Sequence, residues 1–127
     1  MAWLKWFHKK LTLGQRGENA AARALHRAGY TILQRNVRLG AYEIDIIARE
    51  GDTTAFVEVK TRCTADPVPP EENVGHTKRR HIRTAARAYM AKEDDPSMYY
   101  RYDIVSVIMP DQGKPEVTIF RDAFRDE

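Results

Sequence analysis

Two runs of alternating apolar and polar residues, joined by a turn signal, constrain this chain more than any other feature. Residues 43–49 alternate and are rich in isoleucine, and residues 54–62 alternate and are rich in valine. Such alternation is typical of β-strands. Between the runs, Gly51 takes the first position of a two-residue loop, which favours a type II′ turn. The sequence therefore predicts a β-hairpin centred on Gly51 and Asp52.

The segments around this hairpin predict an α/β fold. A helix over 12–28 begins at a capping box formed by Thr12 and Gln15, and Gly29 ends it. The apolar spacing indicates a second helix over 76–92. Further strands are expected over 30–36, 101–109 and 116–120. This order predicts a three-layer sandwich, in which helices flank a mixed central sheet and the hairpin belongs to that sheet.

Length and composition predict one domain without membrane spans or disulfides. The 127 residues include one cysteine, and no apolar run approaches the roughly 18 residues of a membrane span. We expect an N-terminal amphipathic extension over 1–11 and a single domain over 12–124. The apolar start is too short for a signal peptide, so we expect a cytoplasmic protein that binds no membrane. The net charge of +3 is a mild indication of a polyanionic partner.

The hairpin register brings charged side chains together. It sets Asp45 opposite Glu58, and Glu43 opposite Lys60, all on one face. Directly opposed carboxylates destabilise a sheet, and a divalent cation between them reverses that effect. Mg²⁺ accepts carboxylates, waters and substrate phosphate, and it can activate a water against a phosphodiester. Lys60 can orient that water or neutralise the phosphate. The alternative is a solvated sheet face with ordinary cross-strand ion pairs.

The second predicted helix has a one-sided charge. No acidic residue occurs over 73–92. A helix of this kind can follow a phosphate backbone, and each contact adds to the salt dependence of binding. The alternative is a solvated helix face. We call the following residues the basic face and predict that they contact nucleic acid: Lys78, Arg79, Arg80, Arg83 and Arg87.

An ordered set of motifs resembles a known family over about residues 12–124. It includes Gln15-Arg-Gly-Glu18, Glu43-Ile-Asp45 and Phe56-Val-Glu-Val-Lys-Thr-Arg62, with Arg101-Tyr-Asp103 further on. Together these motifs resemble the YraN family of uncharacterised bacterial proteins, within the restriction-endonuclease-like PD-(D/E)xK superfamily. The site layout is similar to that of archaeal Holliday-junction resolvases.

The resemblance implies roles for particular residues. Asp45 and Glu58 would hold Mg²⁺ or Mn²⁺, with the Val59 backbone carbonyl as a further ligand. Lys60 would be the catalytic lysine. Glu18 would approach the metal from the first helix, and Glu43 would be an outer carboxylate. Tyr42 stands where the family usually has a glycine, so we expect its ring to crowd the site.

These observations support more than one function. The first hypothesis is a Mg²⁺- or Mn²⁺-dependent endonuclease that acts on DNA, including branched or repair intermediates. The second is a non-catalytic nucleic-acid-binding module that keeps the nuclease fold. The third is an interaction subunit that docks a partner through its aromatic N-terminus. Cutting two strands symmetrically would need a homodimer.

Overall fold

The computed structural model describes residues 10–64 and 74–125, and every expected element occurs there. Most of the N-terminal extension and most of the loop over 64–75 lie outside these residues. The bounds, in chain order, are α1 (Leu13–Arg27), β1 (Thr31–Leu39), β2 (Tyr42–Glu50), β3 (Thr53–Arg62), α3 (His76–Glu93), β4 (Tyr99–Ile108) and β5 (Glu116–Phe124).

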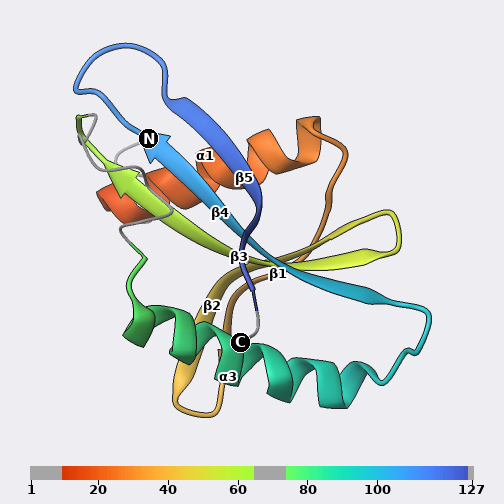
Figure 1. Cartoon of the computed structure of the whole chain (residues 1–127). Helices are drawn as coiled ribbons and strands as arrows, with labels where there is room; N and C mark the ends of the chain where they lie inside the picture. Colours follow the sequence, from red (N-terminus) through yellow and green to blue (C-terminus); the bar gives the residue numbers. More distant parts are fainter. Residues whose placement is uncertain (1–9, 65–73, 126–127) are drawn as a thin grey trace, which may run out of the picture.

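The strands form one mixed sheet in the order β1-β2-β3-β4-β5. β3 and β4 run parallel, and the other neighbours run antiparallel. The helices α1 and α3 cover opposite faces of the sheet (Figure 1). The predicted three-layer α/β sandwich with a mixed sheet and a hairpin is therefore confirmed.

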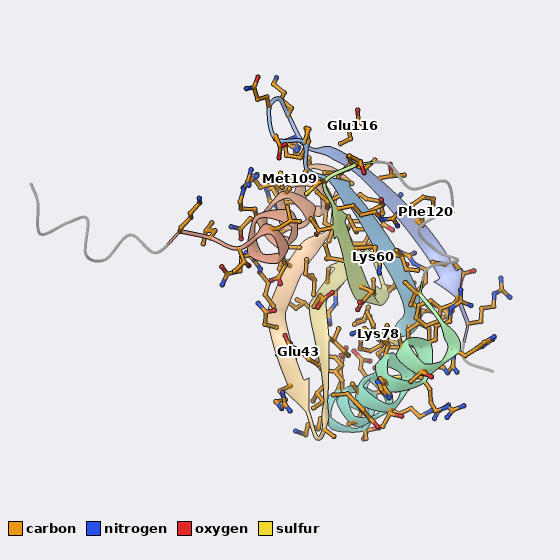
Figure 2. All side chains as sticks on the ribbon, turned by 90° about the vertical axis from the view of Figure 1, so that its left-hand side faces the viewer. Glu43, Lys60, Lys78, Met109, Glu116 and Phe120 are labelled. Carbon is orange, nitrogen blue, oxygen red and sulfur yellow. The ribbon has the colours of Figure 1, made fainter. Side chains whose placement is uncertain are left out.

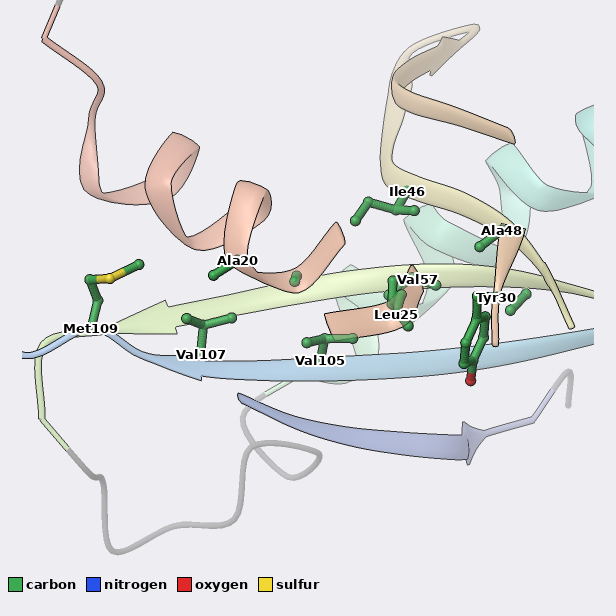
Figure 3. Packing of buried hydrophobic residues seen from close by; sticks show 11 residues of the cluster. Ala20, Leu25, Tyr30, Ile46, Ala48, Val57, Val105, Val107 and Met109 are labelled. Atoms are coloured by element: carbon green, nitrogen blue, oxygen red, sulfur yellow. The ribbon is translucent and has the colours of Figure 1, made fainter. Parts of the chain in front are cut away.

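Local signals set the bounds of α1. The Thr12 hydroxyl accepts from the Gln15 backbone N–H, and the Gln15 side chain accepts from the Thr12 N–H, so the expected capping box forms. Gly29 follows the helix with a φ of 100°, a conformation that glycine adopts without strain. The buried side of α1 carries alanines and Leu25, which pack on residues such as Val57 and Val105 (Figure 3).

The face of α3 that packs against the sheet is apolar. Ile82, Ala85 and Ala86 are buried against residues that include Phe56 and Ile104. Burial of this stripe fixes the rotation of α3 and leaves most of its basic side chains outside the core.

The hairpin register is confirmed where the two strands pair, and the strands then separate. Ile46 lies opposite Val57 and Ile47 opposite Phe56, but the pairing of β2 with β3 extends no further toward Tyr42 and Arg62. Figure 1 shows the β1–β2 hairpin leaving β3 at this point. Strict alternation also breaks, because Ile44 packs with Ile47 on the α3 side while Ile46 packs on the α1 side.

This separation corrects two expected pairings. Asp45 is not paired directly opposite Glu58, because the register ends at Ile46 and Val57. Glu43 does not face Lys60; it lies opposite Arg38 of β1. Figure 2 shows Glu43 on the β1–β2 part of the sheet and Lys60 on β3. The Glu43–Lys60 ion pair of the alternative interpretation does not form.

Candidate metal and nucleic-acid site

Asp45 lies where β2 leaves β3, and its side chain bridges the gap. Its Oδ2 accepts a hydrogen bond of 2.8 Å from the backbone N–H of Val59. That N–H would otherwise need a partner from the departing strand. The contact brings the Asp45 carboxylate beside the residue that precedes Val59, which is Glu58.

Glu58 is a buried carboxylate whose negative charge is only partly balanced by its neighbours. Its residue is 9% exposed. Its Oε1 lies 3.6 Å from the Nζ of Lys78 on α3, a distance too long for a strong hydrogen bond. Its Oε2 is buried and has no hydrogen-bond partner among the described residues. A buried carboxylate oxygen in this state is costly unless a cation or a proton accompanies it.

The carboxylate pair, Asp45 and Glu58, therefore retains a proton more strongly than isolated side chains do. Burial raises the pKa of Asp45, although the Val59 N–H opposes this shift. Burial, followed by the negative charge of Asp45, raises the pKa of Glu58 to about 8. Lys78 acts in the opposite direction on both groups. A divalent cation beside the pair would release this proton.

Glu18 reaches the same region from α1. It is 9% exposed, as its position on the apolar stripe predicts. Its Oε1 accepts hydrogen bonds of 2.9 Å from Arg35 Nε and from Asn36 Nδ2 of β1. Its charge raises the pKa of Asp45.

Arg35 and Asn36 are site residues that the sequence reasoning did not assign. Asn36 lies between Arg35 and Val37, whose partners Ile46 and Ile44 flank Asp45. Its φ of 51° is left-handed, a conformation that asparagine tolerates better than most residues. The available signal was an asparagine inside an otherwise strand-like segment.

Gly17 explains how α1 comes so close to the site. A Cβ added at this position would overlap the Thr61 side chain of β3. Only glycine allows this approach, and it places the next residue, Glu18, at the sheet. In α1, Gly17 therefore allows the close packing against β3, and Glu18 after it supplies the charge.

A hollow of about 490 Å³ joins these elements, and we call it the site hollow. The N-terminus of α1, the carboxylate pair and the end of β3 form its walls. Lys60 lies in this wall and is partly buried. A larger hollow, of about 790 Å³, lies at the C-terminal end of α1, and no carboxylate lines it. The site hollow is lined by Thr12, Gly14, Gln15, Glu18, Asp45, Glu58, Val59, Lys60 and Thr61.

Two expectations near the site differ from the structure. Glu43 is exposed and does not line the site hollow. Tyr42 does not line it either, because its ring stacks on His81 of α3 with 4.1 Å between centroids. Tyr42 thus anchors the separated part of β2 to α3 and does not crowd the carboxylate pair.

The basic face is only partly open to solvent. Arg80 and Arg87 are exposed, and Lys78 keeps 48% of its side chain exposed. Arg79 is tied to the protein, since its Nε donates to the Val74 carbonyl and its guanidinium lies 5.3 Å from the centre of the Phe124 ring. Arg83 is half-buried. That these residues contact nucleic acid remains a prediction.

The donor set fits a hard divalent cation that retains several waters. No group of three or more histidine, cysteine or acidic side chains that could hold a metal occurs within residues 10–64 and 74–125. The site offers two carboxylates, one with the buried unpaired Oε2 of Glu58. Mg²⁺ commonly binds through one or two carboxylates and completes its shell with water and phosphate.

Fold and site together define a three-layer α/β protein in which a partly buried aspartate and a buried glutamate meet where β2 separates from β3. Residues 17–107 match the model of the Uncharacterised protein family UPF0102. A UPF0102 protein of Nocardia farcinica is 44% identical over 115 residues, which cover 91% of each chain. Another, from Caldicellulosiruptor saccharolyticus, is 38% identical over 116 residues, covering 91% of this chain and 98% of that one. The chain belongs to the UPF0102 family, also called YraN, which confirms the resemblance.

Among solved structures, the chain is similar to Hjc, a Holliday junction resolvase from Archaeoglobus fulgidus. The TM-score is 0.46 and the sequence identity is 16%, over 81% of this chain and 74% of that one. Separately, within the described part of the chain no helix is long and apolar enough to span a membrane.

Proposed function

We propose that this protein is a Mg²⁺- or Mn²⁺-dependent endonuclease that hydrolyses phosphodiester bonds of DNA, including branched or repair intermediates. The observation that carries the proposal is the carboxylate pair, in which the partly buried Asp45 and the buried Glu58 line one hollow and Glu58 Oε2 has no hydrogen-bond partner among the described residues. The order of elements also agrees with the expected restriction-endonuclease-like core, whose hairpin carries the site.

Five residues of the site hollow have roles in this proposal. Asp45 and Glu58 hold the cation, together with the Val59 carbonyl. The cation supplies charge neutralisation of the phosphate and activation of a water. Lys60, in the same wall, orients the attacking water or neutralises the phosphate. Glu18, fixed by its two hydrogen bonds, adds negative charge behind the pair.

The basic face would hold the DNA backbone next to the site. Lys78 belongs to both regions, because it begins the basic face and also contacts Glu58. Arg80 and Arg87 are exposed on the same helix. Cationic side chains that neutralise phosphates make binding strongly dependent on salt concentration.

One observation favours the alternative of a non-catalytic nucleic-acid-binding module. Glu18 already accepts two hydrogen bonds from Arg35 and Asn36, so its Oε1 is committed to the protein. A site left with two direct carboxylates can bind a cation weakly and still lack turnover.

The two functions differ in metal binding and cleavage. We would titrate Mn²⁺ and Mg²⁺ calorimetrically into the wild type and into the double variant Asp45→Asn, Glu58→Gln. The same samples would be incubated with plasmid DNA and a four-way junction. Glu116→Gln is the matched control, because Glu116 is exposed on β5 (Figure 2) and outside the site hollow.

The endonuclease predicts that metal binding and cleavage are present in the wild type and in Glu116→Gln and are lost in the double variant. Metal binding without cleavage favours the binding module. Absence of metal binding at millimolar concentrations contradicts the site assignment.

A further inference from the structure

The contact between Lys78 and Glu58 has the properties of a replaceable counter-ion. Lys78 Nζ lies 3.6 Å from Glu58 Oε1, while about half of the lysine side chain remains exposed. The second oxygen of Glu58 stays unpaired. The lysine therefore compensates the carboxylate only in part, and its flexible stem allows the ammonium group to move into solvent without disturbing the core.

Lys78 also belongs to the helix that would meet a phosphate backbone. It lies in the first turn of α3, where the exposed Arg80 follows two residues later. Figure 2 shows Lys78 between α3 and the sheet, with Lys60 on β3 above it. A phosphate that bound to the basic face would therefore compete with the Glu58 carboxylate for the Lys78 ammonium group.

We propose that Lys78 is an internal counter-ion of the carboxylate pair, which couples metal binding to nucleic-acid binding. The inference rests on the proposed function and deepens it. In the free protein Lys78 opposes a divalent cation at Glu58. A phosphate on the basic face draws Lys78 away from Glu58, so the cation binds more tightly. Because linkage is reciprocal, the cation also strengthens DNA binding by the same factor.

The size of the effect follows from the exposure of the pair. Partly exposed ion pairs contribute about 0.2–1 kcal/mol, and 1 kcal/mol corresponds to roughly a five-fold change in affinity. Removal of the lysine charge should therefore tighten cation binding roughly 1.4- to 5-fold.

The test is calorimetric titration of Mn²⁺ into the wild type, Lys78→Met, Lys78→Arg and Lys92→Met at one pH. Lys92→Met removes one positive charge from an exposed residue in the last turn of the same helix, outside the basic face. We expect Lys78→Met to bind Mn²⁺ roughly 1.4- to 5-fold more tightly. Lys78→Arg and Lys92→Met should keep the wild-type affinity. Thermal unfolding of each variant reports whether it is folded.

A second arm repeats the titration with a short DNA duplex, in a Lys60→Met background that prevents cleavage. DNA should tighten Mn²⁺ binding in this background and also when Lys92→Met is added. It should have no such effect when Lys78→Met is added.

The outcomes separate this inference from the proposed function. If Mn²⁺ binds the wild type, and Lys78→Met binds it equally or more weakly, the coupling role is wrong while the metal site stands. If Mn²⁺ binds Lys78→Met but not the wild type, Lys78 competes with the cation for Glu58, as proposed. If Mn²⁺ binds neither protein, both proposals are overturned.

Discussion

At the scale of single residues, the proposed chemistry depends on two acidic side chains, Asp45 and Glu58, whose negative charges have few partners in the fold. Asp45 receives one backbone hydrogen bond, and Glu58 receives a long contact from Lys78. A protein that only needed a stable sheet would place apolar residues here, because unpaired buried carboxylates cost free energy. Such groups are found most often at functional sites.

Glu58→Gln should therefore stabilise the metal-free protein at alkaline pH. The pKa of Glu58 is raised from 4.5 to about 8. Between these values the folded protein keeps a proton that the unfolded chain releases, so the free energy of unfolding falls as pH rises through this window. The variant loses this dependence. We expect it to match the wild type near pH 4 and to exceed it by about 5 kcal/mol near pH 9.

Urea unfolding at both pH values, without divalent ions, measures this difference. Glu116→Gln serves as the control, because this exposed side chain should change stability little at either pH. Equal stability of Glu58→Gln and the wild type near pH 9 would show that Glu58 is compensated in the folded protein.

The sequence predicted several members of the site for physical reasons that are local. The hairpin predicts Asp45, Glu58 and Lys60 in one region, although the paired register ends at Ile46 and Val57, and the family resemblance predicts Glu18. Arg35 and Asn36 could not be found in this way, because they contact Glu18 across elements. The predicted pairing of Glu43 with Lys60 requires ideal pairing beyond Ile46 toward Tyr42, where the strands separate.

At the scale of elements, the approach of α1 to β3 determines the shape of the site hollow. Gly17 faces Thr61 with no room for a side chain. The same helix supplies Thr12, Gly14 and Gln15 to one wall of the hollow. A small displacement of α1 would therefore open the site and move Glu18.

Gly17→Ala should destabilise the protein by about 1–3 kcal/mol, the usual cost of overpacking. It should also weaken Mn²⁺ binding, because α1 moves away from β3. Gly14→Ala is the control in the same helix: the nearest atom to its added Cβ is the Thr12 hydroxyl at 3.9 Å, so it should be neutral or slightly stabilising. Unfolding in urea and Mn²⁺ calorimetry measure both effects. Similar results for the two variants would contradict the close approach.

The sequence predicted the ends of the strands less accurately than the ends of the helices. β5 was expected over 116–120 and continues to Phe124. Arg121 and Asp122 interrupt its apolar pattern before Phe124, and Arg121 pairs with Glu50 at 2.7 Å. Hydrophobic alternation does not reveal a strand end that is held by a long-range ion pair. The helix bounds were closer to expectation, because capping residues act within the segment itself.

At the scale of the whole molecule, two helices on opposite faces meet one opening in the sheet. α1 brings Glu18 and α3 brings Lys78 to the point where β2 separates from β3. The order of elements and the mixed sheet followed from the sequence. The separation of β2 from β3 did not follow from the sequence. It is accompanied by Asn36 in a left-handed conformation and by the stacking of Tyr42 on His81, which strand alternation does not reveal.

The most direct test of the proposed metal site is to locate Mn²⁺ by anomalous diffraction in crystals grown with millimolar Mn²⁺. We predict an anomalous peak within coordination distance of the Asp45 and Glu58 carboxylates, with the Val59 carbonyl as a further ligand. A map without a peak at this position, or with the metal bound only elsewhere, would contradict the metal site and the proposed nuclease.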